Sequence, residues 1–359
     1  MSSSTSISAK KDTLIFFGEM PATADVDTTV IVGKKSFLKE NQAKLSQFVD
    51  VPVDEETVQA MVKAASPGSS STTFVKAKRL TLAAVADKVT RHNHPWSVHT
   101  ITDLVSSTIK GSKARLVFVG VSKSHVGPLA SAVAKAFPLY SRKTNGSKKG
   151  EEEEKEEGDD CNTLTVSFLD EENNAVVDDP ATLQAAASVT EGVRLAARLV
   201  DTTPEELTTD AYAEECRAIA KELGVTMTEI VGEELNEKGY GGIYGVGKAA
   251  TCPPRLIILE YNPTDGPTEN VALVGKAIVY DTGGLSLKPK VGMCGMKVDM
   301  GGSAGLLGGF VAAVKLKAKQ KITLLICLAE NAIGPTAFRN DDILTLYSGK
   351  TVEVNNCDA

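Results

Sequence analysis

The sequence lacks the features that mark disulfide-rich, membrane-inserted and nucleic-acid-binding proteins. Its six cysteines are scattered, with no Cys-x-x-Cys pair, so we expect neither a disulfide framework nor a structural zinc site. The N-terminal region holds only the short apolar run Leu14–Phe17, which is too brief for a signal-peptide core or a membrane span. Positive charge is not in excess, and the net charge of −7 argues against nucleic acid or an anionic membrane as the main partner. These absences favour a cytoplasmic protein.

The chain has enough material for two α/β domains. Its 359 residues, 42% of them hydrophobic and 24% charged, are ordinary for a globular protein of this size. Short apolar runs alternate with amphipathic segments and predict an N-terminal α/β domain over residues 1–180. The basic-then-acidic run at 142–160 predicts a solvated loop within it. A helix at 181–200 then opens a second domain, residues 181–359.

The second domain also alternates between strand-like and helix-like segments. We predict strands at 225–231, 255–260, 271–280 and 321–329, helices at 209–223, 233–238 and 303–317, a glycine-rich turn at 239–247 and a hairpin at 343–354.

Asp281 is the most informative acid in this domain. It follows a buried strand and precedes Thr282-Gly283-Gly284, so its carboxylate lies at the C-terminal end of a strand, where α/β sheets bind their ligands. Lys276 precedes it by an odd number of residues, which would place the two side chains on opposite faces of a regular strand. A bulge at Gly275, or a position of Asp281 already in the loop, would bring them together.

Two further acids also lie at the ends of elements. Asp299 precedes a predicted helix, and Asp358 follows the predicted hairpin. Three carboxylates near glycine-rich turns favour Zn²⁺, Mn²⁺ or Mg²⁺ and fit a two-metal site. Lys276 could be a ligand only after losing its proton, whereas the ammonium of Lys288 could stabilise a developing oxyanion.

Three other motifs compete with this cluster. Gly242–Lys248 has the spacing of a phosphate-binding P-loop, but Ala249 stands where a Ser or Thr must hold magnesium, so its glycines are expected to serve turns. Ser303 fits the serine-hydrolase motif G-x-S-x-G, yet all four histidines precede residue 126, and we expect Ser303 to cap a helix instead. The histidines near residues 92–99 fit no metal-binding spacing.

In its motifs the chain resembles the cytosolic leucyl aminopeptidases. The family pattern VGKG-x₃-FDSGG-x-S-x-K is similar to VGKAIVYDTGGLSLK at 274–288, and M-x-x-DMGG to MKVDMGG at 296–302. The family motif N-[NT]-D-A-E-G-R is similar to NCDA at 356–359. The segments at 241–250 and 348–356 resemble the subgroup called probable aminopeptidase-like proteins. The resemblance implies a mixed sheet flanked by helices in the second domain.

The resemblance also implies a role for each residue. Lys276, Asp281 and Asp299 would bind one divalent ion, Zn²⁺ or Mn²⁺, and Asp281 with Asp358 would bind a second. Lys288 would act as the electrophile in catalysis. The implied reaction is removal of apolar, leucine-like N-terminal residues from peptides, and the implied assembly is a homo-oligomer, a hexamer in the family.

Two more expectations follow from the same resemblance. Met296 would line the pocket for the first side chain of the substrate, beside the metal-binding residues. The family's bridging glutamate, and the arginine that positions a bicarbonate, would fall after Ala359. We therefore expect the catalytic domain to be incomplete and bicarbonate to bind only in a longer form. A catalytically impaired, non-catalytic subunit is the alternative, and a serine hydrolase using Ser303 is the third hypothesis.

Overall fold

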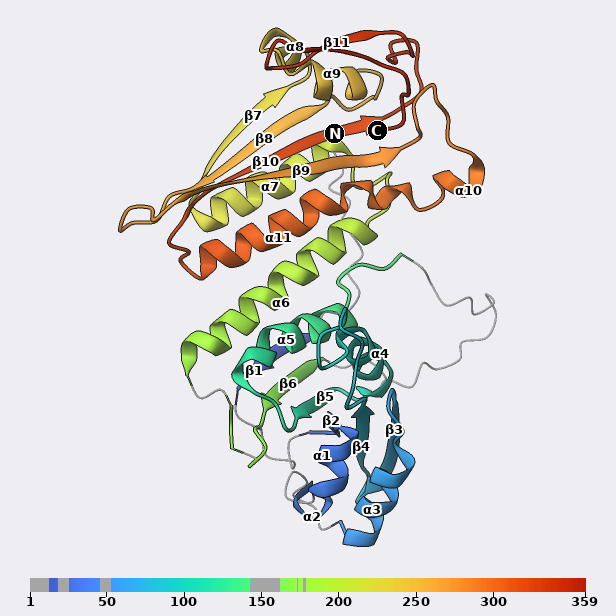
Figure 1. Cartoon of the computed structure of the whole chain (residues 1–359), viewed down its shortest axis with the longest axis vertical. Helices are drawn as coiled ribbons and strands as arrows, with labels where there is room; N and C mark the ends of the chain where they lie inside the picture. The colour runs from blue at the N-terminus through green and yellow to red at the C-terminus, as the bar shows by residue number, and fades with distance from the viewer. Residues whose placement is uncertain (1–12, 19–25, 46–52, 143–161, 173, 177–178) are drawn as a thin grey trace. The chain divides into compact units, whose positions relative to one another are not determined.

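The computed structural model describes residues 13–18, 26–45, 53–142, 162–172, 174–176 and 179–359. The chain forms two compact units, residues 1–194 and 195–359 (Figure 1). The division falls inside helix α6 (Pro180–Asp201), whereas the sequence predicts a domain boundary just before this helix. The charged run predicted as a loop lies outside the described residues, except for Arg142.

The first unit is a six-stranded sheet with helices on both faces. Its elements are β1 (Leu14–Phe17), β2 (Thr28–Lys34), α1 (Lys35–Glu40), α2 (Gln42–Leu45), α3 (Glu55–Ala64), β3 (Ser69–Val75), β4 (Lys78–Val85), α4 (Val98–Thr108), β5 (Lys113–Phe118), the 3₁₀ helix η3 (Lys123–His125), α5 (Val126–Ala136), β6 (Thr163–Phe168) and the first part of α6. The strand order is β1-β6-β5-β2-β4-β3, and only β3 runs antiparallel to its neighbour.

Strand β2 shows why this sheet forms. It is buried along nearly its whole length, as expected for a parallel strand covered on both faces. Because successive side chains point to opposite faces, Val30 and Val32 pack in the core with helices α4 and α5. Ile31 instead packs in the core with α1, α2 and α3. The α/β class expected for the N-terminal domain is confirmed.

The second unit is built on a four-stranded mixed sheet. Its elements are α7 (Thr209–Leu223), β7 (Thr226–Val231), α8 (Glu233–Glu237), α9 (Gly241–Gly247), β8 (Arg255–Tyr261), β9 (Asn270–Asp281), α10 (Lys290–Met293), the 3₁₀ helix η4 (Met296–Met300), α11 (Gly301–Lys315), β10 (Lys321–Asn331), β11 (Ile343–Thr345) and β12 (Thr351–Glu353). The order is β7-β8-β10-β9, with β9 parallel to β10 and the other pairs antiparallel.

Helices cover both faces of this sheet. Helices α7 and α11 pack on one face, where Leu307 and Phe310 of α11 meet Ala277 and Val279 of β9 (Figure 1). Helix α9 packs on the other face, near β10 and β11 (Figure 1). The mixed sheet flanked by helices is therefore confirmed. No helix in the described part of the chain has the length and apolar content needed to cross a bilayer.

The glycine-rich turn predicted at 239–247 is wrong, because most of it forms helix α9. A Cβ on Gly247 would lie 2.5 Å from the Cβ of Pro254, and one on Gly241 would lie 2.2 Å from the carbonyl oxygen of Thr345. These glycines therefore let the helix pack closely on its neighbours instead of forming turns. The P-loop spacing in this segment comes from that packing requirement.

Candidate active site at the end of strand β9

Asp281 is the last residue of β9, and its side chain is almost completely buried. Just before this point the pairing of β9 with β10 is irregular. Ala329 pairs with Ile278 and Asn331 pairs with Asp281, so β9 has one more residue than β10 between these two pairs. This bulge places Asp281 on the same face of the sheet as Lys276, although the two residues are five positions apart in the sequence. The bulge predicted at Gly275 is therefore found nearer the end of the strand.

The carboxylate of Asp281 is held by two hydrogen bonds. Its Oδ1 accepts from the backbone N–H of Gly283 at 2.9 Å and from Nδ2 of Asn331 at 2.8 Å. Its Oδ2 lies 3.1 Å from Nζ of Lys288, an ion-pair contact whose angles do not make a hydrogen bond. Burial raises the pKa of Asp281, but the hydrogen bonds from Gly283 and Asn331, with Asp358 and Lys288, outweigh it and lower the pKa. Asp281 is therefore ionised at neutral pH.

Lys288 lies between two carboxylates. Its ammonium forms ion pairs with Asp281 and with Asp358, and the hydrogen bond that it donates to Asp358 raises its pKa. The loop that carries Lys288 folds back because its backbone N–H donates to the carbonyl of Thr282 at 2.9 Å. Gly284, at φ +58°, is required in this loop, because a Cβ there would lie 2.9 Å from Oδ1 of Asn331. Three of the predicted site residues, one lysine and two acids, are thus brought together.

Asp299 and Lys276 form a second pair beside the first. Asp299 lies on the short 3₁₀ helix η4, and its Oδ1 is 3.0 Å from Nζ of Lys276. Burial raises the pKa of Asp299, and the pairing with Lys276 offsets this only in part. Lys276 also donates to the backbone carbonyl of Ala359 at 2.7 Å. Met296 begins the same 3₁₀ helix and is half-buried.

Asn331 is a site residue that the sequence analysis missed. It is fully buried at the end of β10, and its Nδ2 donates both to Asp281 and to the carbonyl of Cys357, each at 2.8 Å. The backbone N–H of Cys357 in turn donates to Oγ of Ser286 at 3.0 Å. These bonds fix the segment that carries Asp358 against the loop after β9. The sequence did contain a signal for Asn331, since it is a polar residue at the end of a buried strand. Asp281 was predicted from the same signal.

The donor set fits a cation. Oδ2 of Asp299 is buried without a hydrogen-bond partner, and Oδ2 of Asp281, also buried, has only the ion-pair contact with Lys288. Buried anionic oxygens need a positive partner. Three carboxylates against Lys276 and Lys288 leave one net negative charge. Within the described residues, no three His, Cys, Asp or Glu side chains lie close enough together to share a metal ion. The lysine ammoniums supply the positive charge between the acids.

Ser303 has a structural role, and its prediction as a helix cap is wrong. Helix α11 begins at Gly301, with Met300 as its N-cap, so Ser303 lies within the first turn. Its side chain is fully buried; the hydroxyl donates to the carbonyl of Met300 at 2.8 Å and lies 2.9 Å from the hydroxyl of Tyr212. This environment gives no support to a serine nucleophile, which needs an adjacent base.

Comparisons with known proteins agree on one family. The model of the "Cytosol aminopeptidase family, catalytic domain" matches residues 194–359, and that of the "M17 aminopeptidase N-terminal domain 2" matches residues 27–146.

Individual relatives extend these matches. "Probable aminopeptidase NPEPL1" of Mus musculus is 45% identical over 307 residues, which are 86% of this chain and 57% of that protein. "Leucine aminopeptidase 1" of Caenorhabditis elegans is 37% identical, over 92% of this chain and 64% of its own. The structure of leucyl aminopeptidase from Trypanosoma brucei in complex with bestatin superimposes with a TM-score of 0.81 at 33% identity, covering 97% of this chain and 67% of that one. The chain thus spans less than two thirds of the length of these two curated relatives.

Proposed function

This chain belongs to the cytosol aminopeptidase family, and on that basis we propose that its second unit carries a metal-dependent site that releases N-terminal residues, leucine-like ones first, from peptides. The observation that carries the proposal is the buried carboxylate of Asp281 at the end of β9, with Asp299 and Asp358 beside it. Peptides are the proposed substrates by resemblance to the family, whose members are aminopeptidases.

The acids of the cluster are the proposed metal ligands. We assign Lys276, Asp281 and Asp299 to one divalent ion, and Asp281 with Asp358 to a second, Zn²⁺ or Mn²⁺. The two buried carboxylate oxygens without hydrogen bonds support this assignment. Such ions, when bound, polarise a peptide carbonyl and lower the pKa of a water molecule. Lys276 can join them only as the neutral amine.

The remaining residues of the site orient the peptide. The ammonium of Lys288 is held by Asp281 and Asp358, both carboxylates of the proposed ligand set. Once those carboxylates are engaged elsewhere, Lys288 is positioned to donate a hydrogen bond to the oxyanion of the tetrahedral intermediate. Met296, half-buried at the start of η4, is the proposed contact for the first side chain of the peptide.

We also propose a cytoplasmic location and a homo-oligomer, a hexamer by resemblance to the family. Exposed apolar side chains support contact with another molecule: Val291 is 89% exposed and Leu287 is 56% exposed.

A non-catalytic family member is the second candidate function. It is favoured by the ion pairs of Lys276 with Asp299 and of Lys288 with Asp281 and Asp358, which already place a positive charge beside each acid. In this case Lys276 and Lys288 would neutralise the acids permanently, and the unit would act only through its surface.

Metal titration and hydrolysis separate the two candidates. The full chain, stripped of metal, is titrated with Mn²⁺ or Zn²⁺ in a calorimeter and assayed with a fluorogenic leucyl amide. We expect two binding events and metal-dependent hydrolysis, which Asp281→Asn lowers about 100-fold or more. Asp265→Asn is the matched control, because Asp265 is exposed in the loop before β9.

Three results would count against the proposal. Unchanged activity in Asp281→Asn would remove this carboxylate from the site, and hydrolysis by the metal-stripped chain would remove the metals. Tight binding of two ions without hydrolysis would identify a non-catalytic subunit.

A further inference from the structure

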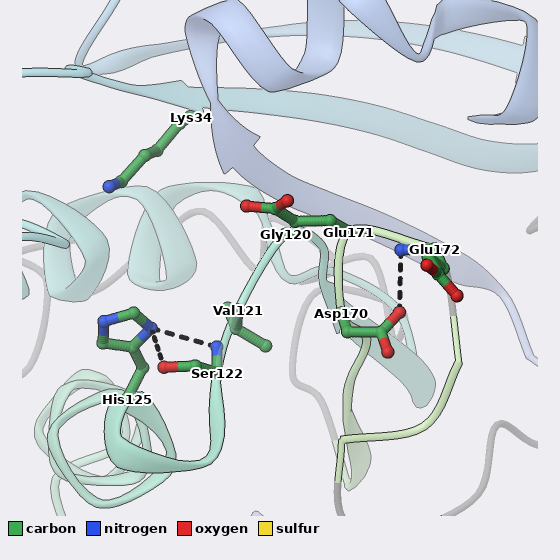
Figure 2. A pocket seen from close by; sticks show the side chains of 8 residues that line it. All are labelled: Lys34, Gly120, Val121, Ser122, His125, Asp170, Glu171 and Glu172. Atoms are coloured by element: carbon green, nitrogen blue, oxygen red, sulfur yellow. Dashed lines mark hydrogen bonds between the residues drawn. The ribbon is translucent and has the colours of Figure 1, made fainter.

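The first unit contains a pocket that the proposed peptidase site does not use. Its volume is about 380 Å³, within the range of small-molecule sites. It is lined by Lys34, Gly120, Val121, Ser122, His125, Asp170, Glu171 and Glu172 (Figure 2).

The pocket lies where this kind of sheet is expected to bind a ligand. Strands β2 and β5 are parallel neighbours in the middle of the sheet. Next to β2 in the sheet lies β4, and next to β5 on the opposite side lies β6. The chain therefore leaves β2 and β5 toward opposite edges of the sheet. Their carboxyl ends, with that of β6, supply all the lining residues. A crevice at such a switch in strand order is the general ligand position of open α/β sheets.

His125 presents a proton donor at this position. Its Nδ1 accepts from the backbone N–H of Ser122 at 3.1 Å (Figure 2). It also accepts from the indole Nε1–H of Trp96 at 3.2 Å. Because both are N–H donors, Nδ1 carries no proton and Nε2 carries it. Burial, with the charges of His94 and Lys34, lowers the pKa of His125, which keeps this tautomer neutral. Nδ1 is thus already occupied, so the Ser122–His125 contact is not a free nucleophile–base pair.

Charges of both signs face the same pocket. The ammonium of Lys34 lies 5.8 Å from the ring centroid of Trp96. Its charge also helps to lower the pKa of Asp87. The opposite wall is a turn held by Asp170, whose Oδ1 accepts from the backbone N–H groups of Glu172 and Asn174. In Figure 2 the carboxylate of Glu171 extends from this turn toward the side of the pocket where Lys34 lies.

We propose that this pocket binds a small zwitterion of the size of a free amino acid. Its carboxylate is bound by Lys34 and by Nε2–H of His125, and its ammonium by Glu171. A simple anion such as phosphate fits less well, because the carboxylates of the turn repel it. A metal ion fits less well, because Lys34 repels it. The proposal concerns the first unit alone and does not depend on the peptidase function.

The chain contains its own reporter for this site. Trp96 is the only tryptophan of the sequence, is fully buried, and contacts both His125 and Lys34. We would therefore titrate the full chain and follow tryptophan emission, in a buffer with a chelator so that the proposed metal site of the second unit stays unloaded. The probes are L-leucine, L-leucinamide (without the carboxylate), 4-methylpentanoate (without the ammonium) and inorganic phosphate.

The expected result is a saturable change in emission with L-leucine, with a Kd of about 1 mM or lower, and binding about tenfold weaker for each single-charge analogue. Lys34→Met and Glu171→Gln should each weaken leucine binding about tenfold. Lys39→Met and Glu40→Gln are the matched controls, because both side chains are exposed at the end of α1, away from the pocket, and they should bind leucine as the unaltered chain does.

Other outcomes overturn the proposal. Phosphate or 4-methylpentanoate binding as tightly as leucine would show a simple anion site, and equal binding of leucinamide would show an ammonium site. No saturable change with any probe, or unchanged leucine affinity in folded Lys34→Met and Glu171→Gln, would show that the pocket does not bind a zwitterion. None of these results bears on the peptidase site, because Trp96 reports only on the first unit.

Discussion

Replacing Asn331 by alanine tests how the site of the second unit is held together. The substitution removes two hydrogen bonds donated by one buried amide, to the Asp281 carboxylate and to the Cys357 carbonyl. A hydrogen bond to a charged group contributes about 1.5–3 kcal/mol, and a buried carbonyl left without a partner costs about 1–3 kcal/mol. The loss is partly offset, because Oδ1 of Asn331 is itself buried without a partner and disappears with the side chain. The expected decrease in the free energy of unfolding is about 2 kcal/mol.

Urea denaturation followed by far-ultraviolet circular dichroism measures this difference. Asn262→Ala is the control, because Asn262 is exposed after β8 and should change the free energy of unfolding by less than about 0.5 kcal/mol. Asn331→Asp keeps the size of the side chain but places a second carboxylate beside Asp281, so it should be the more destabilising variant at neutral pH. If Asn331→Ala were as stable as the control, the hydrogen bonds of this amide would not be what holds the segment of Asp358 against the ends of β9 and β10.

Two further predictions concern polar groups of the second unit, the buried Ser303 and the partly buried Glu229. Ser303→Ala should keep the proposed hydrolytic activity and lose about 1 kcal/mol of stability, because only the bonds to Met300 and Tyr212 disappear. Loss of activity without loss of fold would revive the serine hypothesis. Burial raises the pKa of Glu229, but its bonds with Arg217 and Arg255 outweigh burial and lower it below the ordinary 4.5. The stability from this ionised group is therefore complete above pH 4.5 and is lost as pH falls through the lowered pKa. Glu229→Gln should destabilise the protein by about 3 kcal/mol at pH 7, and the difference in urea midpoint should shrink on acidification; a pH-independent difference would contradict it.

Much of the fold could be predicted because its signals are local. The helix predicted at 209–223 has the bounds of α7, where Thr208 caps the first turn and Gly224 in the left-handed region ends the helix. Helix α9 could not be predicted in this way. Its glycines have poor helix propensity, and what makes them necessary is close packing against Thr345 and Pro254, which the local sequence does not contain.

The charged residues of the candidate site could be predicted from the sequence. The bulge and the hydrogen bonds that bring these residues together could not. Asp281 and Lys288 stand out because charged residues beside glycines follow a buried strand. The bulge that aligns Asp281 with Lys276 depends on the register of β9 against β10. A run of apolar residues does not determine that register. Asn331 depends on the same register, since the parallel pairing of the two strands brings its amide opposite Asp281.

The pocket of the first unit follows the same rule as the proposed peptidase site but has a weaker sequence signal. Lys34 ends β2 as Asp281 ends β9, so each polar side chain lies where a buried strand leaves its sheet. A lone lysine at a strand end does not predict chemistry, because lysines end many strands as solvated groups. Lys34 can be assigned to a site only from the strand order. That order places it beside His125 and opposite Glu171, which are far from it in the sequence. Strand order therefore has to be known before a residue at a strand end can be assigned to a site, and local motif reasoning finds only sites whose residues are close together in the chain.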